Sequence, residues 1–135
     1  MTRVKDVMSK NVKTVEPSAT VVEAAEVMKN HKIGGLVIVD DEKPVGIITE
    51  RDIVYKIVVG KKSLDTKVDE IMSKDLRTIG EERNIDDAAK IMAAHLIRRL
   101  PVVDEGGKLV GIIAVKDIMK AKKVRPESGY YPYLT

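Results

Sequence analysis

The 135-residue chain contains no cysteine, phenylalanine or tryptophan, and it has only four tyrosines. Without cysteine it cannot form disulfides, thiolate metal sites or a cysteine nucleophile. Its core must therefore be built from valine, isoleucine, leucine, methionine and alanine. With 44% hydrophobic and 33% charged residues, the composition is that of an ordinary globular protein of one domain or two very small ones.

Long apolar runs and a strong excess of one charge are also missing. Because no stretch reaches about 18 apolar residues and no signal-peptide pattern opens the chain, we expect a cytoplasmic protein with no membrane partner. The 24 Lys and Arg residues are offset by 21 Asp and Glu residues along the chain, which leaves a net charge of +3. Such a mixed surface is a weak indication of nucleic-acid binding.

Familiar catalytic motifs are absent as well. There is no Walker loop, no G-x-S-x-G elbow and no H-E-x-x-H pair, and the carboxylates that recur along the chain are single rather than paired. His31 and His95 have no second ligand at a suitable spacing, which favours a charge-stabilising or packing role over metal binding. We therefore expect neither an enzyme nor a metal site.

What the chain does contain is an internal repeat. Residues 4–10, VKDVMSK, recur as residues 68–74, VDEIMSK, and residues 45–52, VGIITERD, recur as residues 110–117, VGIIAVKD. The offset is 64 residues for the first pair and 65 for the second, a difference that one turn residue explains. Because a domain of about 60 residues is only marginally stable alone, we expect the two copies to pack on each other.

Each copy predicts a strand, a helix, two strands and a second helix, which is an α+β fold. Apolar residues at i, i+3, i+4 and i+7 predict the first helix of each copy, and a capping box at Thr20 and Glu23 opens one of them. Apolar runs at 36–39 and 100–103, each followed by a short turn, predict hairpins with the VGII strands. The predicted boundaries are 1–60 and 68–124 for the two domains, 61–67 for a linker and 125–135 for a tyrosine-rich tail.

The junction between strand and helix at residues 45–52 is the most informative stretch. Thr49 lies where an N-cap hydroxyl belongs, and Asp52 follows three residues later, which is the spacing of a capping box. Alternatively, Asp52 binds two vicinal hydroxyls of a nucleotide while Thr49, Arg51 and the helix N-terminus bind phosphate. Gly46 and Gly111, within the repeated strands, mark either close packing or the approach of a ligand to the backbone.

The doubled order of elements, the DVMS-type opening, the VVEAAEVM helix, the LVIVD and LPVVD strands and GIITERD together resemble a tandem pair of CBS domains, of the cystathionine β-synthase type. The resemblance covers residues 4–122. It implies two pseudo-symmetric β-α-β-β-α domains, packed through their sheets, that form a Bateman module. It also implies a non-catalytic sensor, commonly a homodimer, with no required cofactor, that binds AMP, ADP, ATP or S-adenosylmethionine in two clefts and regulates a separate, unidentified protein.

The same resemblance assigns roles to individual residues. Asp52 and Asp117 become the ligands of the ribose hydroxyls, Thr49 lies beside the ribose and phosphate, and Arg98 and Arg99 match a phosphate-binding pair. The second copy has Ala114 in place of the threonine, so one copy keeps the hydroxyl and the other carries the arginines. The remaining ligand-binding candidates are Thr14, Val15, Gly35, Leu36, Arg51, Thr78, Ile79, Leu100, Pro101 and Lys116.

Two alternatives stay open. Arg98 and Arg99 come soon after a predicted helix end, where the helix dipole favours solvated cations without any ligand. The whole protein, in turn, could be a nucleic-acid-binding or scaffold protein that uses the fold for dimerisation. A nucleic-acid surface should gather basic residues with stacking aromatics, and the interspersed charges argue against it. Apolar residues in excess of one packed face at 53–59 support a homodimer.

Overall fold

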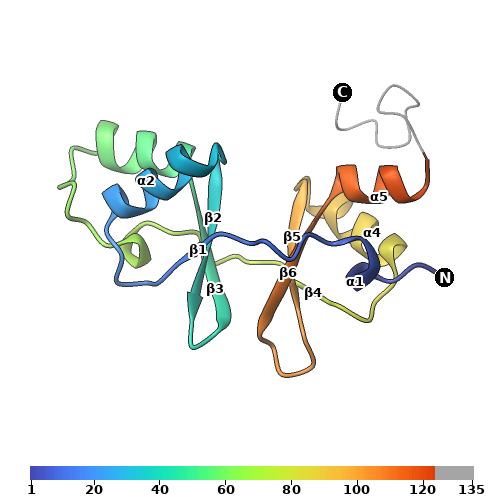
Figure 1. Ribbon diagram of the computed structural model, residues 1–135. Helices are drawn as coiled ribbons and strands as arrows, with labels where there is room; N and C mark the ends of the chain where they lie inside the picture. The colour runs from blue at the N-terminus through green and yellow to red at the C-terminus, as the bar shows by residue number, and fades with distance from the viewer. Residues whose placement is uncertain (124–135) are drawn as a thin grey trace. The chain divides into compact units, whose positions relative to one another are not determined.

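The computed structural model describes residues 1–123, so the tyrosine-rich tail predicted at 125–135 lies outside the described residues. The chain forms two compact units. The central unit is Lys13–Leu76, and the terminal unit combines Met1–Val12 with the chain from Arg77 onward. Figure 1 shows the elements of both units.

The central unit holds a three-stranded sheet in the order β1-β2-β3, made of β1 (Thr14–Val15), β2 (Gly35–Asp40) and β3 (Lys43–Thr49). Strand β1 is parallel to β2, and β2 is antiparallel to β3. Helix α2 (Val21–His31) separates the first two strands, and β3 leads into α3 (Glu50–Asp52), which continues as the π-helix η1 (Ile53–Val59). A short 3-10 helix, η2 (Val68–Glu70), follows.

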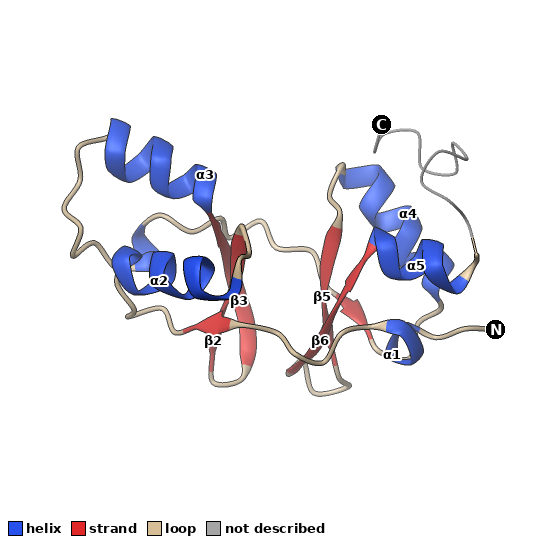
Figure 2. Cartoon of the chain, turned by 45° about the horizontal axis from the view of Figure 1, so that its top comes forward, coloured by secondary structure: helices blue, strands red, loops and turns tan. Residues whose placement is uncertain are grey.

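The terminal unit repeats this plan. Its sheet has the order β4-β5-β6, made of β4 (Ile79–Gly80), β5 (Arg99–Val103) and β6 (Leu109–Ala114), with α4 (Ile85–His95), α5 (Val115–Ala121) and the short α1 (Val4–Val7). In each unit the two longer helical segments lie on one face of the sheet (Figure 2). The predicted α+β class and the order of elements in each copy are confirmed.

The opening segment of each repeat packs in the unit of the other repeat. Ser73 and Ile47 exchange two main-chain hydrogen bonds of 2.9 and 3.0 Å in the central unit. In the terminal unit Ser9 and Ile112 do the same, both at 2.9 Å. The compact units therefore do not coincide with the repeats along the sequence. Residues 4–10, which open the first repeat, pack in the terminal unit, and residues 68–74, which open the second repeat, pack in the central unit.

This exchange accounts for the two repeated strand glycines. A Cβ atom on Gly46 would lie 2.5 Å from the Met72 sulfur and 2.9 Å from the Ser73 carbonyl oxygen. On Gly111 it would lie 2.5 Å from the Met8 sulfur and 2.8 Å from the Ser9 carbonyl oxygen. Of the two interpretations of these glycines, close packing is the one that the structure bears out.

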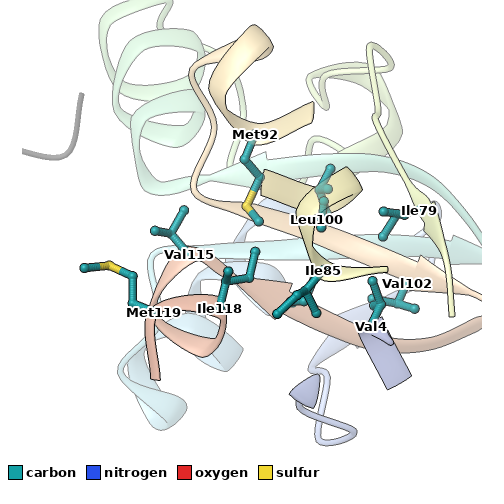
Figure 3. Packing of buried hydrophobic residues seen from close by; sticks show 11 residues of the cluster. Val4, Ile79, Ile85, Met92, Leu100, Val102, Val115, Ile118 and Met119 are labelled. Atoms are coloured by element: carbon teal, nitrogen blue, oxygen red, sulfur yellow. The ribbon is translucent and has the colours of Figure 1, made fainter. Parts of the chain in front are cut away.

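Each unit has its own apolar core. The predicted helix faces are buried as expected, and Met28 and Met92 are only 4% and 0% exposed. Val4, from the opening segment, lies within the terminal core beside Val102 (Figure 3). The fully buried aliphatic residues of the central core include Val21, Ile38, Ile48, Ile57 and Val68. These cores hold the ends of β3 and β6 in place, and the candidate sites lie there.

Candidate functional site

At the end of β3, Asp52 is held by the residue that caps its helix. Its Oδ2 atom accepts hydrogen bonds from the Thr49 main-chain N–H at 2.9 Å and from the Thr49 hydroxyl at 3.0 Å. The Asp52 N–H in turn donates to the Thr49 hydroxyl oxygen at 3.2 Å. The capping box expected from the sequence is therefore present. It fixes the carboxylate, whose side chain is 18% exposed, at the end of the strand.

Sequence reasoning missed one further partner of this carboxylate. The ammonium of Lys56 lies 3.3 Å from Asp52 Oδ1 and donates a 2.7 Å hydrogen bond to the main-chain carbonyl of Ile71. A spacing of four residues along a helix places side chains on one face, so the pair Asp52 and Lys56 was visible in the sequence. The contact with Ile71 was not, because it joins residues 15 apart through the tertiary fold.

The corresponding junction of the terminal unit is simpler. Asp117 Oδ2 accepts a 2.8 Å hydrogen bond from the Ala114 N–H, and Ala114 has no hydroxyl to add a second. Within residues 1–123, Asp117 Oδ1 has no hydrogen-bond or ion-pair partner. A cavity of about 410 Å³ adjoins this carboxylate, lined by Asp6, Val7, Asp117, Lys120 and Ala121.

The basic candidates lie near these junctions and are exposed. Arg99 pairs with Ala114 across the β5–β6 ladder, and the Arg98 carbonyl accepts the Val115 N–H at 3.0 Å, so both arginines flank the terminal junction. In the central unit Arg51 lies over the ring of Tyr55, 5.3 Å from its centroid, a cation–π distance. Lys116, at the start of α5, is exposed.

The strand candidates lie in or next to the same sheets, and half of them have buried side chains. Gly35 pairs with Thr49, and Thr14 pairs with Val37 two residues further along β2. Equivalent edge positions differ in burial between the units: Thr14 is exposed where Thr78 is half-buried, and Val15 is half-buried where Ile79 is only 3% exposed. The structure leaves Leu36, Ile79, Leu100 and Pro101 with little to offer a ligand except their main chain.

The two histidines are not part of these junctions. His31 and His95 are exposed at the last positions of α2 and α4, where a cation is favoured by the helix dipole. Among residues 1–123 no group of three or more metal-ligating side chains comes together. Over the same residues, no helix is both long enough and apolar enough to cross a membrane.

Comparison with known proteins gives two matches to one family model, described as the CBS domain, over residues 4–59 and 68–124. An uncharacterized protein of Methanopyrus kandleri is 42% identical over 121 residues, which is 88% of this chain and 62% of that protein. The chain thus spans less than two thirds of that relative's length.

Two solved structures are similar over nearly the whole described chain. The CBS domain pair of protein MJ0100, in complex with 5-methylthioadenosine and S-adenosyl-L-methionine, has a TM-score of 0.76 and 35% identity, covering 91% of this chain and 97% of its own. CBSX2 of Arabidopsis thaliana in complex with AMP has a TM-score of 0.78 and 29% identity, with the same coverage.

Proposed function

The chain belongs to the CBS domain family, and from this membership we propose that it is a non-catalytic regulatory module that binds an adenine nucleotide or a related adenosyl ligand. Two relatives with the same fold bind such compounds, one AMP and the other S-adenosyl-L-methionine with 5-methylthioadenosine. The ligand sites that we propose lie at the strand-to-helix junctions, one at Asp52 and one at Asp117.

The observation that carries this proposal is the matching pair of anchored carboxylates. In both units a main-chain N–H at the end of a strand holds one oxygen of the aspartate at 2.8–2.9 Å. An ionised carboxylate accepts about four hydrogen bonds, so Asp117 retains sites for both hydroxyl donors of a ribose. Asp52, which already binds the Thr49 N–H, the Thr49 hydroxyl and Lys56, retains about one. A carboxylate that is held before binding loses less entropy when the ligand arrives.

The phosphate groups of AMP, ADP or ATP need cationic donors, and these differ between the proposed sites. At the terminal junction Arg98, Arg99 and Lys116 are available, and guanidinium groups bind phosphate in a bidentate manner. At the central junction Arg51 supplies the cationic donor, and the Thr49 hydroxyl adds a neutral one if it gives up its hydrogen bond to Asp52 Oδ2. We assign the base to the main chain of the neighbouring strand residues: Thr14, Val15, Gly35, Leu36, Thr78, Ile79, Leu100 and Pro101.

A regulatory module must transmit ligand binding to a second protein. We propose that this module acts as a homodimer. The segment from η1 onward exposes a group of apolar side chains, in which Val54 is 47%, Val58 65% and Val59 69% exposed. Contiguous exposed apolar surface of this kind marks an interaction site. Sedimentation at micromolar concentration tests the dimer, and a strictly monomeric protein counts against it.

Ligand identity decides the proposal most directly. Purified protein is denatured and the released small molecules are identified by mass spectrometry, followed by calorimetric titration with AMP, ADP, ATP and S-adenosylmethionine. A ligand that binds only the folded state raises the free energy of unfolding by about 2.7 kcal/mol at 100 times its dissociation constant. No change in melting temperature with any of the four at millimolar concentration would reject the nucleotide site, and binding of short DNA or RNA instead would favour the scaffold alternative.

A further inference from the structure

The central unit contains an ammonium group bound by two acceptors. Lys56 Nζ lies 3.3 Å from the carboxylate of Asp52 and donates at 2.7 Å to the carbonyl of Ile71, in a partly buried setting. Ile71 belongs to the opening segment of the second repeat and is 3% exposed. The lysine therefore places a positive charge between a helix carboxylate and the main chain of that segment.

The terminal unit has the same two acceptors but no lysine at the position that corresponds to Lys56. The repeat aligns Asp117 with Asp52 and Val7 with Ile71, whereas the position of Lys56 is taken by Ala121. A methyl group cannot span the distance that the lysine side chain covers. An open pocket of about 410 Å³ adjoins these positions instead, and Asp117, Val7 and Ala121 line it together with Asp6 and Lys120.

We propose that this cavity binds the primary ammonium group of a small organic amine, in the position that Lys56 Nζ occupies in the central unit. The ammonium has three N–H donors, and Asp117 Oδ1 has no partner within the described chain. Asp6 adds a second negative charge, although its Oδ2 already accepts the Arg3 N–H at 2.9 Å. The preference for an ammonium follows from the central unit, where the counterparts of Asp117 and Val7 bind one.

Lys120 is the one cationic side chain in the described lining of this cavity, and it forms no ion pair with a described residue. Its counterpart in the central unit is Tyr55, so the repeat gives it no equivalent role. The amine site shares Asp117 with the proposed nucleotide site, but its test requires no nucleotide. Because a carboxylate offers about four acceptor positions, Asp117 can bind an ammonium and ribose hydroxyls together.

The repeat supplies a reciprocal test, with n-butylammonium chloride as the probe and backbone amide shifts by NMR as the readout. The wild-type protein is expected to show saturable shifts around Val7 and Asp117. Ala121→Lys places the protein's own ammonium between Asp117 and Val7 and should weaken these shifts at least tenfold. Lys56→Ala opens the central counterpart and should add a second saturable response around Asp52 and Ile71.

Two controls make the outcome decisive. Tetramethylammonium chloride at equal concentration carries the charge without N–H donors, and equal shifts with it would overturn the proposal. Asp117→Asn keeps the acceptor for the Ala114 N–H but removes the charge, so it should also weaken butylammonium binding at least tenfold, whether or not Ala121→Lys folds. Unchanged butylammonium binding in Asp117→Asn would overturn the proposal. Binding that is seen only in Lys120→Met would also overturn it, because the Lys120 ammonium would then occupy the site in the wild-type protein.

Discussion

The strand-to-helix junctions of the two units differ in how firmly they hold the same aspartate. In the central unit Asp52 is engaged by the Thr49 N–H, the Thr49 hydroxyl and the Lys56 ammonium. In the terminal unit the Ala114 N–H alone, among the described residues, engages Asp117. One hydrogen bond, from main chain to carboxylate, is thus common to both. The side chains around it differ, so most hydrogen-bond acceptor positions of Asp52 are occupied within the protein, whereas most of those of Asp117 are open.

Removal of the shared carboxylate should have the largest effect. Asp52→Ala and Asp117→Ala each delete charge-assisted hydrogen bonds to the proposed ribose, worth about 1.5–3 kcal/mol, so affinity at that site should fall on the order of 10- to 150-fold. Calorimetric titration of each variant with AMP measures this. If both variants bind as wild type does, the carboxylates serve only as helix caps.

The two strand glycines should respond alike, because the same close approach occurs in both units. Gly46→Ala and Gly111→Ala force a Cβ atom against a main-chain carbonyl at 2.9 and 2.8 Å. Such overpacking costs typically about 1–3 kcal/mol of folding free energy. Urea unfolding measures it, with Gly106→Ala as the matched control, since a Cβ there meets only the Asp104 side chain at 3.5 Å. A loss confined to one glycine would contradict the equivalence.

Substitution of the N-cap residues should make the two junctions more alike in their contribution to folding free energy. Thr49→Ala removes the hydroxyl that accepts the Asp52 N–H and should cost about 0.5–2 kcal/mol of folding free energy. Ala114→Ser introduces a hydroxyl at the corresponding position and should recover part of that amount in the terminal unit. Thermal unfolding of both variants gives the comparison. A stabilising Thr49→Ala would show that the cap contributes nothing.

The arginines should separate the two proposed sites by their dependence on phosphate and salt. Arg98→Ala combined with Arg99→Ala should weaken AMP binding roughly fivefold, about 1 kcal/mol, because both guanidinium groups are exposed and screened. Adenosine binding should be unaffected, and the AMP affinity of the wild type should fall with salt. Equal affinity for AMP and adenosine at the Asp117 site would remove the arginines from phosphate binding.

The smallest effect on stability is expected from the polar contacts that hold each opening segment to its unit. In the terminal unit Lys5 donates to Glu82 at 2.7 Å and Arg3 pairs with the same carboxylate. The Lys5 hydrogen bond, followed by that of Arg3, lowers the pKa of Glu82 below its usual value. In the central unit the counterpart contact is charge to main chain, from Lys67 to the Ser18 carbonyl at 3.2 Å.

A carboxylate whose pKa is lowered on folding stabilises the folded state above its unfolded pKa, and this contribution is lost as the pH falls through the folded value. Glu82→Gln should therefore be slightly less stable than wild type at pH 7, with the difference closing in acid. Thermal unfolding of Glu82→Gln and wild type between pH 7 and pH 3 tests the sign. A constant difference across that range would exclude a role for the Glu82 charge.

Local patterns in the sequence were enough to predict much of the fold. Helices α2 and α4 follow from their apolar period, the hairpins from short apolar runs joined by turns, and the cap at Thr49 from a spacing of three residues. Each of these depends on residues that are neighbours along the chain, so short-range geometry determines them. The repeat likewise required only that one stretch be compared with another.

Tertiary structure alone decided which partner each opening segment takes. Residues 4–10 and 68–74 are nearly alike, and each carries an apolar residue, Val4 or Val68, that fits either core. No local pattern therefore shows whether an opening segment packs with the repeat that it begins or with the other repeat. Long-range packing makes that choice, burying Val4 with Ile118 and Val68 with Ile48. The same packing brings Ile71 to Lys56 and leaves Val7 facing a cavity, because contacts between distant segments depend on the folded core rather than on spacing along the chain.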